Sequence, residues 1–118
     1  MSTIYLAVVL GGLGIAFVEQ LLLPRFVARN TSWGLAPGWQ REIAFWNIGL
    51  GAVIVGALRM GNPNCTSVVV GALVVLTSLL GLNHLLAALA NREAWLHRVG
   101  ALVNALAAIA GVMLLLYA

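Results

Sequence analysis

Four long apolar runs constrain this chain more than any other feature of its sequence. They cover approximately residues 3–23, 39–60, 66–90 and 92–117. A helix needs about 20 mostly apolar residues to cross the hydrocarbon core of a bilayer, and the second run reaches this length if Trp39 to Glu42 form its first turn. The sequence therefore predicts an all-α, polytopic membrane protein, in which residues 1–118 form a single domain with a four-helix transmembrane bundle.

The composition supports a membrane protein and argues against several other classes. Hydrophobic residues make up 63% of the chain and charged residues 8%, whereas soluble domains carry about 25% charged residues. The basic residues are scattered between the apolar runs, so the contiguous basic stripe of a nucleic-acid-binding protein is missing. Cys65 is the only cysteine, which rules out an internal disulfide. No catalytic triad, phosphate loop or dinucleotide fingerprint is present, and we expect neither a cofactor nor a metal ion.

The arginines predict how the bundle is oriented in the membrane. Five of the six basic residues lie in the segments 24–42 and 90–99, namely Arg25, Arg29, Arg41, Arg92 and Arg98, while Arg59 lies on the other side. Basic residues concentrate in cytoplasmic loops. We therefore expect both segments to face the cytoplasm, where these arginines would contact anionic lipid headgroups. Both termini would then lie outside it, in the periplasm if the protein spans a bacterial inner membrane.

The polar residues inside the apolar runs are predicted to lie at one depth. Glu19, His84 and Asn104 each lie four or five residues from the cytoplasmic end of their run, which corresponds to roughly 6–9 Å along a helix. The candidate ligand- or ion-binding residues are Glu19, Glu42, Asn47, Asn83, His84 and Asn104. An ionisable side chain inside a membrane helix is costly and needs partners. The layer is therefore either a binding site or a hydrogen-bonded plug that fixes how the helices pack.

Helical spacing predicts which way these residues face. Glu19 shares a stripe with Gly12 and Ala16, and His84 shares one with Gly81, which marks faces where membrane helices approach closely. We therefore expect Glu19 and His84 to form one buried site. The second run has two polar faces, one through Glu42, Trp46, Gly49, Val53 and Gly56, and one through Gln40, Ala44, Asn47 and Gly51. At least one of them should be buried within the chain, leaving the other for a second subunit.

Two further patterns bear on assembly and on metal binding. The small-residue pairs Ala52/Gly56 and Ala107/Gly111 permit close helix approach and predict a homo-oligomer or a larger membrane complex. Glu93 precedes a histidine, His97, by four residues. That spacing occurs in metal sites, but it is also common at an exposed helix start, and we interpret the pair as such a start.

Parts of the chain resemble a known family. The stretch from Trp39 through Asn47 to Gly51, and the Gly-x-x-His formed by Gly81 and His84, are similar to a family of small, uncharacterised bacterial four-helix membrane proteins. Asn91 and Gly100 continue this resemblance, which covers roughly residues 34–104. The chain departs from the family between the first two helices, where it has Arg-Asn-Thr-Ser at positions 29–32 instead of a histidine-containing stretch. The family has no established activity, so the resemblance supports the fold and the choice of residues only.

Three functions remain open from the sequence. The first is a non-catalytic membrane protein that associates with itself or with a larger complex, its polar layer serving in packing. The second is an oligomeric transporter or channel that binds a proton, a cation or a small polar solute at Glu19 and His84. The third is a membrane enzyme that acts on a lipid-soluble substrate, although the absence of catalytic motifs favours a non-enzyme.

Overall fold

A computed structural model describes residues 1–117, and these residues are almost entirely helical. Within them five helices follow one another: α1 (Ser2–Leu22), α2 (Pro24–Asn30), α3 (Pro37–Met60), α4 (Pro63–Ala90) and α5 (Trp95–Tyr117). The four long helices are apolar enough and long enough to cross a membrane. The predicted all-α, four-helix membrane bundle is therefore confirmed.

The short helix α2 was not predicted, because the segment between the first two predicted helices, residues 24–38, was expected to be a loop. Pro24 ends α1 as expected, but it also occupies the first turn of α2, and Pro37 does the same for α3. Proline suits this position because its φ angle is already helical and the N–H that it lacks would have no partner there. Helix α3 therefore begins before Trp39, so that Trp39 to Glu42 do belong to its first turns.

The connection between α3 and α4 is a tight turn defined by two residues. Gly61 ends α3 in the left-handed conformation, with φ of 60°, which glycine adopts without steric cost. The side chain of Asn62 then caps α4 by accepting hydrogen bonds from the backbone N–H groups of Asn64 and Cys65, at 2.9 and 3.3 Å. This turn brings α4 back antiparallel to α3.

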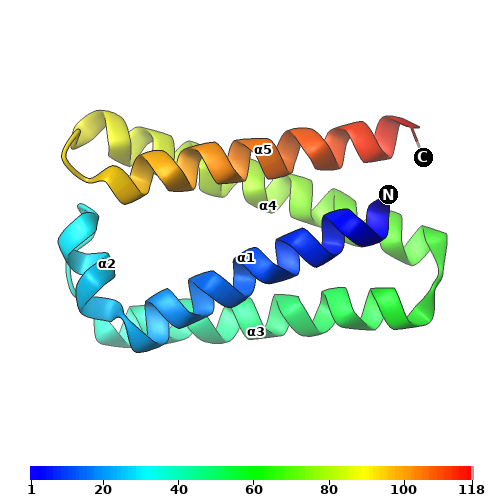
Figure 1. The fold of residues 1–118 in the computed structure, drawn as a ribbon, viewed down its shortest axis with the longest axis horizontal. Helices are drawn as coiled ribbons and strands as arrows, with labels where there is room; N and C mark the ends of the chain where they lie inside the picture. Colours follow the sequence, from blue (N-terminus) through cyan, green and yellow to red (C-terminus); the bar gives the residue numbers. More distant parts are fainter. Residues whose placement is uncertain (118) are drawn as a thin grey trace.

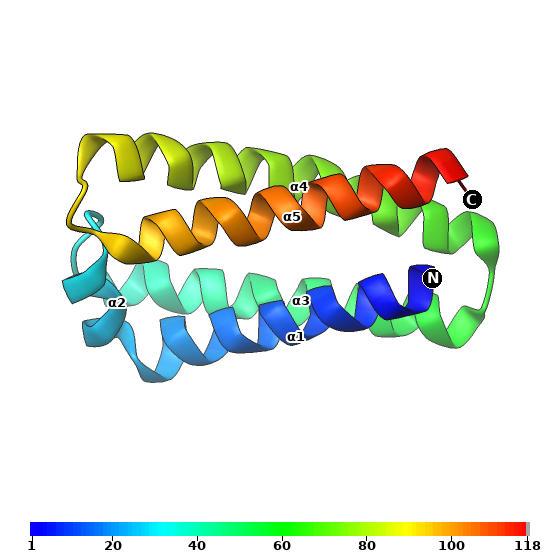
Figure 2. The ribbon, with the colours of Figure 1, turned by 45° about the horizontal axis from the view of Figure 1, so that its top comes forward.

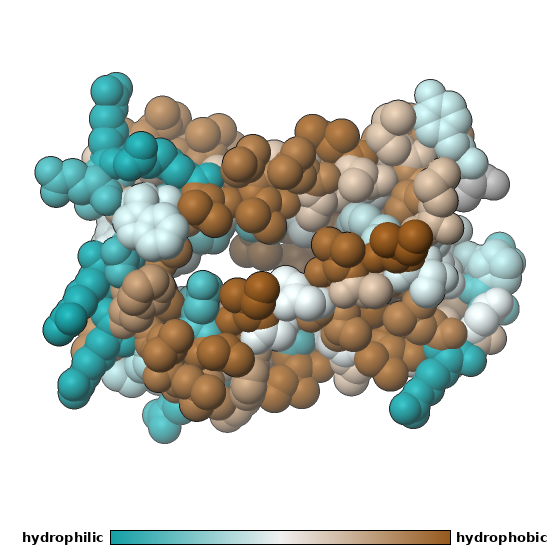
Figure 3. All heavy atoms as spheres, in the orientation of Figure 1, coloured by the Kyte–Doolittle hydropathy of each residue, from teal (hydrophilic) through white to brown (hydrophobic). Residues whose placement is uncertain are grey.

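The helices form two pairs that lie one over the other (Figures 1 and 2). Helix α1 packs along α3, and α4 packs along α5, whereas contacts between the two pairs are few. Helix α2 lies across one end of the bundle, opposite the start of α1 and the end of α5 (Figure 1). A space-filling view shows a hollow between the two pairs in the middle of this face (Figure 3). The pairs are thus joined mainly near their ends.

At the end opposite α2, an apolar cluster joins the pairs. Its buried members come from α1, α3 and α4 and are Tyr5, Leu6, Ile54, Val70 and Leu73. Gly111 of α5 completes it, since a Cβ atom added there would lie 2.5 Å from a methyl carbon of Val74 and 2.8 Å from the Tyr5 hydroxyl oxygen. Gly111 therefore packs inside the chain, and the expectation that it mediates contact between subunits is wrong.

The two faces of α3 differ in burial as expected. Its buried residues are Gln40, Ala44, Gly51, Ile54 and Ala57, on the side that meets α1 and α4. On the opposite side Trp46 is 73% exposed and Val53 is 54% exposed, and no atom lies within 4 Å of a Cβ added to Gly49. The side with Glu42, Trp46, Gly49 and Val53 is covered by no part of the described chain. We refer to these four residues as the outer face of α3.

Most of the surface of the spanning helices is not covered by other parts of the described chain. In each spanning helix at most 22% of the most apolar window is buried within the chain, and the space-filling view shows apolar side chains over most of this face (Figure 3). Hydrophilic side chains gather at the end where α2 lies. The spanning helices therefore contact lipid directly, because lipid is the solvent of a membrane protein. Gly12 illustrates this: it is exposed with open space around it, so the expected close approach at its stripe is not formed.

Candidate functional site

Four residues form a polar and aromatic cluster where α2, α4 and α5 meet. His84 lies near the end of α4 and His97 in the first turn of α5, while Ser32 and Trp33 belong to the connection between α2 and α3. The hairpin of α4 and α5 brings the two rings together, with their Nδ1 atoms 3.2 Å apart. We call Ser32, Trp33, His84 and His97 the histidine cluster. It joins the two helix pairs at the α2 end, as the apolar cluster does at the other end.

The hydrogen bonds of the histidine cluster assign the protonated nitrogen of each neutral ring. The backbone N–H of Ser32 donates to Nε2 of His97 at 3.0 Å. A backbone N–H can only donate, so this Nε2 is an acceptor, and neutral His97 carries its proton on Nδ1. That proton then points to Nδ1 of His84, which must accept, leaving the His84 proton on Nε2. The cluster is therefore a directed chain of donors that runs from Ser32 through His97 to His84.

The hydroxyl of Ser32 and the indole of Trp33 complete the cluster. The hydroxyl oxygen lies 2.9 Å from Nε2 of His97. The Trp33 ring centroid lies 4.5 Å from that of His97 in an edge-to-face arrangement and 4.9 Å from that of His84. Aromatic pairs at these separations attract one another beyond the burial of their area. Trp33 thus covers both rings, and His97 has no exposed surface at all.

Close approach of α4 and α5 is what allows the rings to meet. A Cβ atom added to Gly100 would lie 2.7 Å from Nδ1 of His84, so any larger residue there would displace the ring. At the next contact a Cβ atom on Gly81 would lie 3.3 Å from the Cβ of Asn104. Asn104 turns its amide back to its own helix and donates to the Gly100 carbonyl at 2.8 Å. Glycine on each helix thus faces a polar side chain of the other.

The predicted polar residues do not form a single layer. The structure does not pair His84 with Glu19, since the hydrogen bond that it gives His84 is to His97. Glu19 and Asn47 are partly buried on α1 and α3, whereas Glu42 and Asn83 are exposed. Whether these residues bind a ligand or an ion stays a prediction. Physically the layer divides because α1 packs on α3 while α4 packs on α5.

The pair α1 and α3 has polar groups of its own. Gln40 is buried and well bonded: its amide donates to the Pro24 carbonyl at 3.2 Å, and its oxygen accepts from the backbone N–H of Ala36 at 3.3 Å. By contrast, Oε1 of Gln20 and Nδ2 of Asn47 are buried without a hydrogen-bond partner among the described residues. Buried polar atoms of this kind are costly in a protein interior and more so in hydrocarbon. This pair is thus less completely satisfied than the histidine cluster.

Sequence reasoning missed three of the four members of the histidine cluster. His97 was interpreted as part of an exposed helix start with Glu93, which is wrong because His97 is fully buried. The available signal was the spacing of His97 and Gly100, which places an imidazole and the smallest residue on adjacent parts of one helix face. Trp33 and Ser32 were not among the candidate residues, and neither had a signal beyond its place in a loop.

The donor set of the histidine cluster fits hydrogen bonding better than metal binding. Within residues 1–117 no three His, Cys, Asp or Glu side chains are grouped so that they could hold a metal ion, and a zinc site uses at least three protein ligands. The ring nitrogens that face each other are already joined by a hydrogen bond. What the cluster offers to a ligand is the N–H on Nε2 of His84, which has no hydrogen bond to the described part of the chain.

Comparison with protein-family models, with curated proteins and with solved structures gave no match to this chain.

Proposed function

We propose that this chain is a non-catalytic integral membrane protein that acts by associating with further copies of itself, and that the outer face of α3 is the contact surface. The observation that carries the proposal is that α3 has two polar faces, of which its own chain covers one. The uncovered face holds a carboxylate, Glu42, and a glycine with open space around it, Gly49. Another helix can offer the carboxylate a polar partner and can pack closely against the glycine, whereas lipid does both less well.

Symmetry and charge both suit a second copy at this face. Copies inserted the same way up can be related by a two-fold axis along the membrane normal, which places the same face of α3 on both sides of the contact. The two Glu42 carboxylates would then approach each other at the depth of Arg41 of both copies, and each carboxylate could be neutralised by pairing with Arg41 of the other copy. Gly49 lies two turns further into the membrane and would allow the backbones to approach.

In this proposal the histidine cluster has a supporting role. It holds the connection between α2 and α3 against α4 and α5 through the bonds of Ser32 to His97. Helix α3 begins only a few residues later, at Pro37. The cluster thereby fixes the start of α3, and with it the position of Glu42, relative to the second helix pair.

Cysteine cross-linking in native membranes tests the contact surface. In a Cys65→Ser background, Val53→Cys places a thiol on the outer face of α3, and Val103→Cys places one on α5 at nearly equal exposure, 54% and 55% for the native valines. A disulfide needs Cα atoms about 4.4–6.8 Å apart. We expect oxidation to give a covalent dimer with Val53→Cys and a monomer with Val103→Cys. Equal cross-linking of the two variants would contradict the proposal.

A second candidate function rests on the unpaired Nε2–H of His84. In an oligomer this N–H could donate a hydrogen bond to a small polar solute, and the ring could carry a proton by protonation at Nδ1 when its bond to His97 opens, as expected for a transporter or channel. Proteoliposomes with a pH-sensitive dye inside provide the test after an external pH jump. Proton flux that is lost in His84→Gln and kept in Asn83→Ala would favour this function, whereas no flux above protein-free liposomes would remove proton transport.

The distribution of arginine supports an orientation with α2 and the α4–α5 turn in the cytoplasm and both termini outside it. Arg25 and Arg29 lie on α2, and Arg92 and Arg98 lie at the turn, at the same end of the bundle. The resemblance to bacterial four-helix membrane proteins supports our further proposal that the membrane is a bacterial inner membrane. A reporter active only in the cytoplasm should remain inactive when fused after residue 118, and activity there would reverse the orientation.

A further inference from the structure

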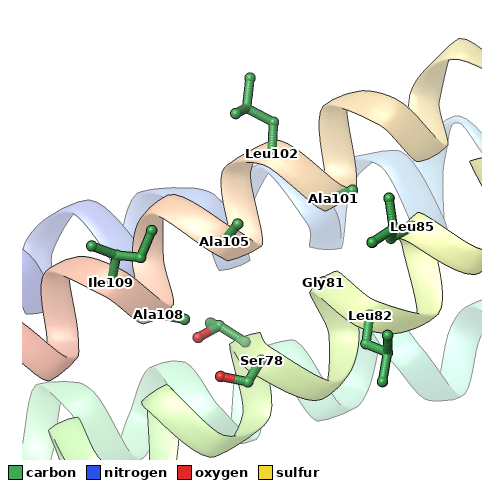
Figure 4. A pocket seen from close by; sticks show the side chains of 10 residues that line it. Ser78, Gly81, Leu82, Leu85, Ala101, Leu102, Ala105, Ala108 and Ile109 are labelled. Carbon is green, nitrogen blue, oxygen red and sulfur yellow. The ribbon is translucent and has the colours of Figure 1, made fainter.

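A groove lies between α4 and α5. Its volume is about 550 Å³, and it is lined by aliphatic and small residues of the two helices (Figure 4). Ala101, Ala105 and Ala108 line it from α5, opposite Gly81 and Leu85 of α4. Two hydroxyl residues, Thr77 and Ser78, also line it at one end; the Thr77 hydroxyl donates to the Leu73 carbonyl of its own helix at 2.8 Å, so apart from the Ser78 hydroxyl the lining is apolar. The groove therefore presents a mostly apolar surface to whatever occupies it.

The cationic side chain of Arg98 lies on the same face of α5 as the groove, at the end of the groove nearest α2. Positions 98, 102, 105 and 109 follow the i, i+4, i+7 spacing of one helix face, so Arg98 extends the line of lining residues by one turn. Its guanidinium donates to the backbone carbonyl of Arg92 at 2.7 Å. That bond holds the guanidinium at the α4–α5 turn without neutralising its charge, since the acceptor is a carbonyl. A second arginine, Arg92, belongs to the same turn.

We propose that this groove binds one acyl chain of an anionic glycerophospholipid whose phosphate contacts Arg98. The lining of the groove from Ala101 to Ile109 extends over about 12 Å of α5, which fits within the roughly 15 Å depth of one leaflet. Arginine recognises phosphate through charge and through paired N–H donors.

Native mass spectrometry of the purified full-length protein tests this, with phosphatidylglycerol and phosphatidylcholine of identical acyl chains as probes. We expect phosphatidylglycerol to bind more tightly than phosphatidylcholine, and Arg98→Ala to weaken phosphatidylglycerol about fivefold, the effect of one arginine at an anionic surface. Arg59→Ala, which removes an exposed arginine at the other end of the bundle, should change neither. Glycerol 3-phosphate should not compete, because it lacks the acyl chain.

The groove itself is tested by filling it. Ala105→Phe and Leu102→Trp should each weaken the binding of both lipids, whereas Ala110→Phe, on an exposed part of α5 away from the groove, should not. Circular dichroism checks that each variant is folded. If a variant with a filled groove is unfolded, the arginine variants still test the proposal independently. The proposal is overturned if Arg98→Ala leaves the preference for phosphatidylglycerol unchanged. It is equally overturned if Ala105→Phe dissociates an oligomer without altering lipid binding, which would identify a second copy as the occupant.

Discussion

Replacing Gly100 by alanine should destabilise the protein, although alanine is the better helix former. The added Cβ would lie 2.7–2.8 Å from Nδ1, Cγ and Cε1 of His84, which is closer than a carbon atom can approach a ring. The ring has little freedom to retreat, because Trp33 and His97 pack against it. It must therefore rotate or shift, and its hydrogen bond to His97 is lost.

The expected magnitude follows from three contributions. Overpacking costs about 1–3 kcal/mol, and loss of the ring-to-ring hydrogen bond costs about 0.5–1.5 kcal/mol. The higher helix propensity of alanine offsets this cost by about 0.8–1 kcal/mol. Gly100→Ala should therefore lower the free energy of unfolding by about 1–3 kcal/mol. Gly71→Ala is the matched control on α4, because nothing lies within 4 Å of a Cβ there, and it should raise the stability by up to about 1 kcal/mol.

Unfolding of both variants in mixed micelles with rising SDS content, followed by helicity, measures this difference. The double variant Gly100→Ala/His84→Ala adds a specific check, since removal of the ring makes room for the new methyl group. The cost of Gly100→Ala should then largely disappear, which gives a coupling energy of about 1 kcal/mol or more between the two sites. If Gly100→Ala is as stable as Gly71→Ala, the close packing of α4 and α5 at His84 is refuted.

Three further predictions concern hydrogen bonds of single residues. Gln40→Ala should destabilise the protein by about 1–3 kcal/mol in the same assay, because a carbonyl of α2 and an N–H before α3 lose their buried partner. Asn62→Ala should cost about 0.5–2 kcal/mol by removing the cap of α4, while Asn62→Asp, which keeps the acceptor, should cost little. Nitrogen NMR of labelled imidazoles near neutral pH should show the proton of His97 on Nδ1 and that of His84 on Nε2, and the reverse pattern would contradict the assigned chain of donors.

The long helices were predictable because each depends on a property summed over many residues. About 20 apolar positions in a row outweigh any single exception, and prolines and glycines mark the ends. Helix α2, with seven residues, offers no such average. Its start at Pro24 was interpreted only as the end of α1, although a proline that ends one helix can also occupy the first turn of the next.

The sequence predicted the depth of the polar residues along their helices, but not the direction in which their side chains face. Counting residues from the predicted cytoplasmic ends located His84 and Asn104 near the α2 end of the bundle, and both do lie in the region where α4 and α5 pack closely. The direction in which a side chain points around the helix axis is harder to predict than its depth, because consecutive residues are rotated by about 100° around that axis. Gly12 and His97 were misjudged for this reason: the first was expected to be buried and is exposed, and the second was expected to be exposed and is buried.

The choice of Glu19 as the partner of His84 treated all four helices as equally near, and the packing of the helices shows that they are not. Short turns join α4 both to α3 and to α5, but α4 packs along α5 and contacts α3 much less. Positions on α4 therefore have their first candidate partners on α5, and the structure gives His84 a hydrogen bond to His97 of that helix. The longer segment between α1 and α3 leaves room for α2, so that Ser32 and Trp33 can reach across to the other pair. The partner of His84 is thus set by the helix against which α4 packs, and its depth in the membrane alone could not identify that partner.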